Sequence, residues 1–106
     1  MEQYAAGIVM YNPDIKRLKE NLDAVYKQVK WVYCYNNGLQ NDIEVNALLN
    51  TYENIQIIGT GTNVGIATAL NELVKKAKED DIEWILTLDQ DSVVCDLKSR
   101  PNYTHI

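Results

Sequence analysis

The sequence predicts an α/β fold in which a parallel sheet is covered by helices on both faces. Four short runs rich in β-branched and aromatic residues alternate with three segments of helical periodicity. Because a helix connects each strand to the next, right-handed crossovers and parallel strands are expected. The length of 106 residues suits one domain. We expect residues 1–96 to form this domain and residues 97–106, which lack periodicity, to form an irregular tail.

The first strand and helix have clear signals. The continuous apolar run from Ala5 to Tyr11 is typical of a strand buried on both faces. Asn12-Pro13-Asp14 predicts a helix start, with Asn12 as the N-cap and Pro13 at the first helical position. Apolar residues then recur at steps of three and four and define the buried face of the helix, namely Ile15, Leu18, Leu22, Val25 and Val29.

A second strand is predicted over residues 31–35, and it stops at the turn residues Asn36-Asn37-Gly38. Cys34 and the tyrosines on either side of it are expected to pack in the core. The next helix, over residues 42–51, has a weaker periodicity. Its inward-facing residues are predicted to be Ile43, Ala47 and Leu48.

The third strand, Ile55 to Ile58, leads into a glycine-rich loop over residues 59–65. The glycine spacing and the position after the third strand fit a plain connection at least as well as a dinucleotide-binding loop. Asn63 is the expected N-cap of the helix that runs on to Glu79. The apolar face of this helix is predicted to comprise Ile66, Leu70, Leu73, Val74 and Ala77. A fourth strand, residues 84–88, ends at Asp89-Gln90-Asp91.

Composition argues against several functions. Fifteen acidic and ten basic residues give a formal net charge of −5, which is unfavourable for binding nucleic acid. No apolar run reaches the roughly 18 residues of a membrane span, and the N-terminus lacks a secretory signal, so a cytoplasmic location is expected. Cys34 and Cys95 make neither a disulfide framework nor a zinc pattern. The one histidine, His105, lies in the tail, so no Ser-His-Asp or Cys-His site is expected.

Ligands of open parallel sheets bind beyond the carboxyl ends of the strands, where the strand order reverses. If the second and third strands extend one side of the first, and the fourth lies on the other side, Tyr11 and Asn12 come close to Asp89 and Asp91. Two carboxylates at this spacing can bind one divalent cation, with phosphate oxygens completing its shell. Formation and capping of the turn by the aspartates is the alternative interpretation.

Four segments together resemble the N-terminal, donor-binding half of a family 2 glycosyltransferase, close to its rhamnosyltransferase-like branch. The resemblance covers residues 5–94 and is carried by residues 9–13, 36–38, 63–71 and 84–92. It implies a three-layer, Rossmann-like fold of the GT-A type that is incomplete at its C-terminus. In this family the acceptor site and the catalytic base follow the Asp-x-Asp strand, so no catalytic base is expected among these 106 residues.

The resemblance also implies a reaction. A sugar would be transferred with inversion from a nucleotide diphosphate, dTDP-rhamnose in this branch, to a glycan or lipid-linked acceptor. For the full-length family, the resemblance would allow a location at the inner face of the membrane. Mg²⁺ or Mn²⁺ would be held by Asp91, with Asp89 contacting the donor ribose or the waters of the metal.

The same resemblance assigns the nucleotide-binding residues. Tyr11, Asn12 and Pro13 would line the nucleotide, and Asn63 and Gly65 would border the same site. Asn36 stands where the family usually has an aspartate that accepts a hydrogen bond from the base. An asparagine carbonyl can still accept that bond, although without a charge.

Two other functions remain open from the sequence. Residues 86–93 also fit the strand and Asp-x-Asp motif of haloacid-dehalogenase-like phosphatases, with Asp89 as the nucleophile, although that motif opens the fold of those enzymes. A non-catalytic α/β module that binds a nucleotide or a protein partner is the second.

The fourth strand would form an apolar edge of the sheet, which predicts self-association.

Overall fold

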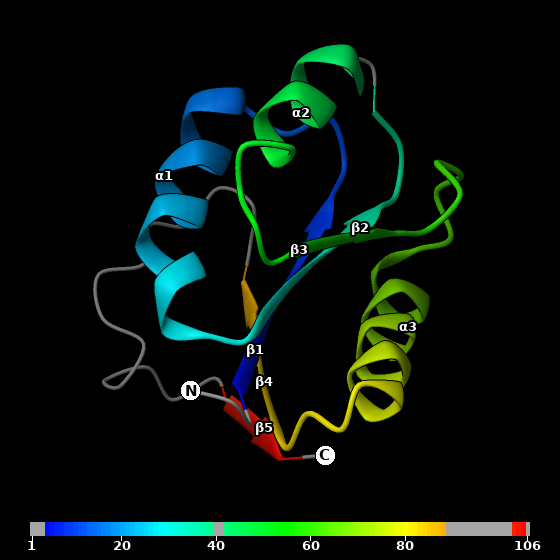
Figure 1. Ribbon diagram of the computed structural model, residues 1–106. Coiled ribbons are helices and arrows are strands. Elements are labelled where there is room, and N and C mark those ends of the chain that lie inside the picture. The colour runs from blue at the N-terminus through cyan, green and yellow to red at the C-terminus, as the bar shows by residue number, and fades with distance from the viewer. Residues whose placement is uncertain (1–3, 40–41, 89–102, 106) are drawn as a thin grey trace.

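The computed structural model describes residues 4–39, 42–88 and 103–105. They form one sheet with the strand order β3-β2-β1-β4-β5, as Figure 1 shows. The strands are β1 (Tyr4–Met10), β2 (Trp31–Asn36), β3 (Ile55–Ile58), β4 (Trp84–Leu88) and β5 (Tyr103–His105). The helices are α1 (Ile15–Val25), the short 3-10 helix η1 (Tyr26–Gln28), α2 (Asp42–Leu49) and α3 (Ile66–Glu79). The predicted α/β fold and the order of its first four strands are confirmed.

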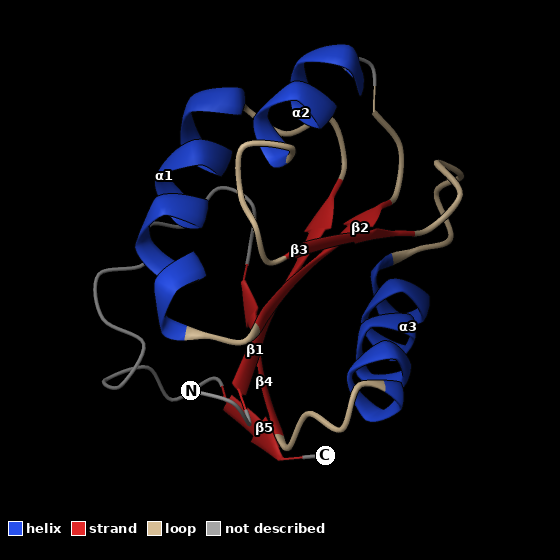
Figure 2. Ribbon diagram, viewed as in Figure 1, coloured by secondary structure: helices blue, strands red, loops and turns tan. Residues whose placement is uncertain are grey.

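Helices cover both faces of the sheet, and Figure 2 shows α1 and α2 on one side and α3 on the other. Alternate residues of the central strands face the two sides, so Ile8 packs toward α1 and α2 while Ala5 packs toward α3. Gly7 allows α3 to approach closely, because a Cβ at this position would lie 3.1 Å from Leu73 Cδ1. Cys34 is a free, fully buried thiol, and this burial raises its pKa to about 12.

The first helix begins later than the sequence predicts. Its N-cap is Asp14, whose Oδ1 accepts hydrogen bonds from the backbone N–H groups of Lys16 and Arg17. Asn12 cannot be the cap because its φ of 43° places it in the left-handed region, where it turns the chain out of β1. Pro13 accordingly precedes the helix and is buried. At the other end, α1 stops at Val25, and Val29 reaches the core from beyond η1.

The second helix presents a different face to the core from the predicted one. Val45 and Leu49 are buried, whereas Ile43 is 81% exposed and Ala47 is exposed. Leu48 is partly buried, as expected. Apolar residues occur on several sides of this short helix, so packing against the α1 side of the sheet, and not periodicity, selects the buried pair.

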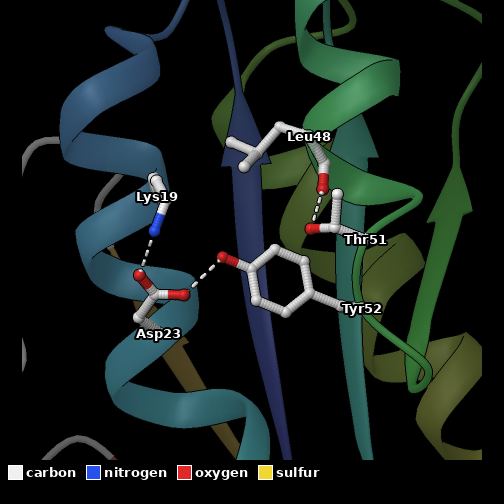
Figure 3. Close-up of polar contacts among 5 residues, drawn as sticks. All are labelled: Lys19, Asp23, Leu48, Thr51 and Tyr52. Carbon is white, nitrogen blue, oxygen red and sulfur yellow. Dashed lines mark hydrogen bonds and ion pairs between the residues drawn. The ribbon is translucent and has the colours of Figure 1, made fainter.

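A polar cluster joins the end of α2 to α1 (Figure 3). Asp23 accepts hydrogen bonds of 2.6 Å from both Lys19 Nζ and the Tyr52 hydroxyl. The hydrogen bond from Lys19, with that from Tyr52, holds the pKa of Asp23 below its usual value. Thr51 Oγ1 donates to the carbonyl of Leu48 at 2.7 Å and closes the turn that leads to Tyr52.

The third helix begins at Ile66, with Gly65 and not Asn63 as its N-cap. Leu73 and Ala77 are buried and Leu70 and Val74 are partly buried, as predicted, whereas Ile66 is 61% exposed. Ile66 lies in the first turn of the helix, beyond the part that packs on the sheet. Ala69 takes the corresponding place in the core.

Residues 103–105 differ from the irregular tail predicted for residues 97–106, and the rest of that tail lies outside the described residues. Tyr103–His105 forms β5 and pairs antiparallel with β4, with Trp84 opposite His105 and Leu86 opposite Tyr103. A strand of three residues is too short to give a periodic pattern, so the sequence alone did not indicate it. Over these positions β4 is paired on both sides, and self-association of the chain stays a prediction.

Candidate functional site

The carboxyl ends of β1, β2, β3 and β4 meet at one edge of the sheet because these four strands are parallel. The first strand is central here. Ile8 pairs with Cys34 of β2 on one side and with Leu88 of β4 on the other. The chain therefore builds outward from β1 in one direction and returns on its other side, so the strand order reverses between β1 and β4 as predicted.

The turn after β2 is closed by Asn36. Its Oδ1 accepts a hydrogen bond from the Gly38 N–H at 3.1 Å, while its backbone carbonyl accepts one from the Gly61 N–H at 3.2 Å. The first bond forms an Asx-type turn, and the second joins β2 to the loop between β3 and α3. Gly59 is required in this loop because a Cβ there would lie 2.8 Å from the Asn36 carbonyl oxygen.

The loop after β1 lies against the same turn. The Asn12 N–H donates to the Gly38 carbonyl at 2.9 Å. The Tyr11 ring packs over Gly38, since a Cβ on that glycine would be 3.3 Å from two ring carbons. The Tyr11 side of the site is accessible, because this residue is 51% exposed.

The loop before α3 is attached to the β2 turn through Asn37. The Oδ1 of Asn37 accepts from the Val64 N–H at 2.8 Å, and its Nδ2 donates to Asn63 Oδ1 at 3.2 Å. Asn63 Oδ1 also accepts from the Gly65 N–H at 2.9 Å. Sequence reasoning missed Asn37. Its available signal was its position, immediately after a buried strand and before a glycine.

Six of the predicted site residues therefore lie at one edge of the sheet, Asn36 at the end of β2 and the others on the loops after β1 and β3: Tyr11, Asn12, Pro13, Asn36, Asn63 and Gly65. The predicted metal ligands Asp89 and Asp91 lie outside the described residues. Within the described residues, no group of three or more His, Cys, Asp or Glu side chains could hold a metal ion.

The described part of the site carries no charge. The loop segments 11–13, 36–39 and 59–65 contain no ionisable side chain except the Tyr11 phenol, and they offer amide, hydroxyl and backbone groups. Such an edge is suited to neutral hydrogen-bonding partners such as a heterocyclic base or a sugar. Neutralisation of a bound phosphate would require groups from elsewhere, such as a cation held by carboxylates.

Comparisons with known proteins agree with this architecture. The family model described as glycosyl transferase family 2 matches residues 6–97, a range that begins within β1 and includes β2, β3, β4 and all three loops. The chain is 35% identical over 89 residues to the dTDP-rhamnosyl transferase RfbF of Shigella flexneri, an alignment that covers 82% of this chain and 29% of RfbF. It thus spans less than a third of the length of that curated relative.

Two further observations bear on the alternatives. The Asp-x-Asp sequence follows β4, the fourth strand along the chain, whereas it follows the first strand of a haloacid-dehalogenase-like fold. Among the helices that the structure describes, none has the length and apolar character to cross a membrane. The family match, the identity to RfbF and the parallel strand order agree with one another, and the chain belongs to glycosyltransferase family 2.

Proposed function

We propose that the chain is the donor-binding part of an inverting glycosyltransferase that uses a nucleotide-diphosphate sugar. The observation that carries this proposal is the hydrogen-bonded assembly of three loops at the point where the strand order reverses. The family match includes all of these loops. The name of RfbF favours dTDP-rhamnose as the donor. A glycan or lipid-linked molecule is the proposed acceptor.

The neutral loops are suited to the nucleoside. Thymine presents an imide N–H between two carbonyl groups, and an asparagine amide can both accept and donate hydrogen bonds. Asn36 Oδ1 has a second lone pair beyond the bond that it accepts from Gly38. The half-exposed Tyr11 ring offers an apolar surface beside this amide. We therefore assign base recognition to Asn36 and Tyr11, with Asn12, Pro13, Asn63 and Gly65 bordering the nucleotide.

The diphosphate requires a positive charge that the described loops do not provide. We assign it to Mg²⁺ or Mn²⁺ held by Asp91 and Asp89, which directly follow β4 in the sequence. When bound, the cation would neutralise the charge on the diphosphate leaving group. We place the catalytic base, which deprotonates the acceptor hydroxyl, outside residues 6–97, the range that the family model matches. The proposed location is the cytoplasm, where the free Cys34 thiol stays reduced.

Calorimetric titration of the 106-residue chain tests the proposal. We expect dTDP to bind in the presence of Mn²⁺ and much more weakly without it. A parallel titration with UDP shows whether the chain distinguishes thymine from uracil. Asp91→Ala should weaken the Mn²⁺-dependent affinity roughly tenfold or more, since it removes a charged ligand. Glu53→Ala is the matched control, because Glu53 is an exposed acid before β3, at the opposite edge of the sheet.

Two results would contradict the proposal. Failure of the wild-type chain to bind either nucleotide would remove the donor-binding function. Binding that is equally strong in wild type, Asp91→Ala and Glu53→Ala would remove the metal assignment and leave nucleotide binding in place.

A further inference from the structure

Asn37 has an unusual environment for a polar residue at the edge of a binding site. It is 5% exposed and lies at the end of β2 between the loops that follow β1 and β3. Its backbone N–H donates to the Met10 carbonyl at 2.9 Å, and its side chain makes the two bonds to Asn63 and Val64. One residue therefore connects both sides of the candidate site.

The direction of each hydrogen bond in this network is fixed by backbone groups. The Val64 N–H can only donate, so the atom of Asn37 that faces it must be the carbonyl oxygen. The Gly65 N–H likewise requires that Asn63 present its own oxygen. The Asn37 NH₂ group then faces the Asn63 oxygen at 3.2 Å as the donor. An acid at position 37 would place two acceptors against each other, whereas an acid at position 63 would keep every bond.

We propose that Asn37 is a positioning residue that sets the separation between the carboxyl end of β1 and residues 63–65, and thereby the affinity for the nucleotide donor. The inference rests on the proposed function, since it concerns the same site. Asn37 would act through its neighbours, because its side chain is buried behind the loop residues that it holds. The nearly complete burial also means that its hydrogen bonds cannot be replaced by water without cost.

A matched pair of substitutions tests this role. Asn37→Asp and Asn63→Asp make the same chemical change and add the same charge at neighbouring positions. We expect Asn37→Asp to weaken Mn²⁺-dependent dTDP binding roughly tenfold, because it loses a buried donor and sets acceptor against acceptor. Asn63→Asp adds the same charge at the border of the site but keeps the bonds that residue 63 accepts from Gly65 and Asn37, so its loss of dTDP affinity should be several-fold smaller than that of Asn37→Asp. Binding is measured at a temperature at which thermal unfolding curves show each variant to be folded.

Amide exchange with water, followed by NMR, gives a second measurement that does not depend on a ligand. In the Asn37→Asp variant, Asn63 can supply a donor to the new carboxylate only by rotating its own amide. The Gly65 N–H then loses its acceptor, so it should exchange faster in Asn37→Asp but not in Asn63→Asp. Asn37→Ala should instead increase the exchange rate of the Val64 N–H. A purely structural role for Asn37 would lower the unfolding temperature without this residue-specific pattern.

The outcomes separate this inference from the proposed function. Equal loss of dTDP affinity in the two acidic variants would overturn the inference, because charge alone would then explain both. Unchanged Gly65 exchange in Asn37→Asp would also overturn it. If wild type binds neither dTDP nor UDP, the donor-binding function and the donor-related role of Asn37 both fail, while the exchange pattern still decides whether Asn37 holds residues 63–65 in place.

Discussion

The Tyr33 hydroxyl group donates a 2.7 Å hydrogen bond to Asp80 Oδ2 and so joins the middle of β2 to the C-terminal end of α3. Gln56 Nε2 of β3 donates to the same oxygen at 2.9 Å, and Lys76 Nζ lies 3.5 Å from Asp80 Oδ1. Because Tyr33 is fully buried, its hydroxyl needs a partner within the protein. This cluster attaches the C-terminal end of α3 to β2 and β3.

Replacement of Tyr33 with Phe tests this contribution. The substitution removes the hydroxyl and keeps the ring, so we expect the free energy of unfolding to fall by about 1–2 kcal/mol. Urea unfolding at neutral pH measures the change. Tyr35→Phe is the matched control, because Tyr35 lies on the same face of β2 and its hydroxyl makes no hydrogen bond within the described residues. Equal losses in the two variants would contradict a specific role for the bond to Asp80.

The same cluster predicts a dependence of stability on pH. Burial of Asp80 opposes its ionisation, but the hydrogen bonds from Tyr33 and Gln56 and the charge of Lys76 outweigh that effect and lower the pKa of the carboxyl group. A lowered pKa in the folded state stabilises the protein above the ordinary Asp pKa of about 3.9, and this stabilisation is lost as the pH falls through the folded value.

We therefore expect the free energy of unfolding to decrease from about pH 5 toward pH 2, and to decrease less steeply in Asp80→Asn. Asp23 has a lowered pKa as well, so the decrease should be reduced and not abolished. Urea unfolding at a series of pH values gives the slopes. Glu53→Gln, which removes an exposed acid, should keep the wild-type slope. A slope in Asp80→Asn identical to that of wild type would contradict the assignment.

The strands and their order could be predicted because β1, β2 and β4 are buried on both faces and appear as continuous apolar runs. The ends of the helices and their buried faces were harder to predict from the sequence. Asn12-Pro13-Asp14 contains two residues able to cap a helix. Asp14 is the N-cap because the backbone of Asn12 is in the left-handed region. In α2 the buried face depends on contacts with α1 and the sheet, which local periodicity does not encode.

The candidate site was predictable in outline, since strand ends can be located once the topology is known. The different contacts of the Asn36 and Asn37 side chains could not be predicted. Neighbouring residues in an extended chain point to opposite sides, so Asn36 closes its own turn while Asn37 reaches the loop before α3. Which of the two does so depends on the path of residues 59–65, which are distant in the sequence.

Two glycines of the loop before α3 give a matched test of backbone packing. Both have a positive φ, 92° at Gly59 and 85° at Gly65. A Cβ at Gly59 would lie 2.8 Å from the Asn36 carbonyl oxygen and 3.0 Å from a Tyr35 ring carbon, whereas a Cβ at Gly65 would contact nothing within 4 Å. Gly65→Ala should therefore cost only the backbone strain, about 1–3 kcal/mol.

Gly59→Ala should add a steric clash with β2 to the same backbone strain, and should destabilise the protein by at least about 1 kcal/mol more than Gly65→Ala. Urea unfolding of the two variants side by side measures the difference. Equal destabilisation would show that Gly59 is needed for its φ value alone and that the loop does not pack closely against β2.

The pairing of β5 with β4 leads to a prediction about association. Removal of residues 103–106 uncovers the backbone of β4 at Trp84, Ile85 and Leu86. An apolar strand with unpaired N–H and C=O groups is a template for pairing with another chain. We expect the shortened chain to show a mass that rises with concentration in light scattering, and the 106-residue chain to show a smaller rise. Removal of Ile106 alone, which keeps β5, is the control. Identical masses for all three chains across the concentration range would mean that β5 does not protect this edge.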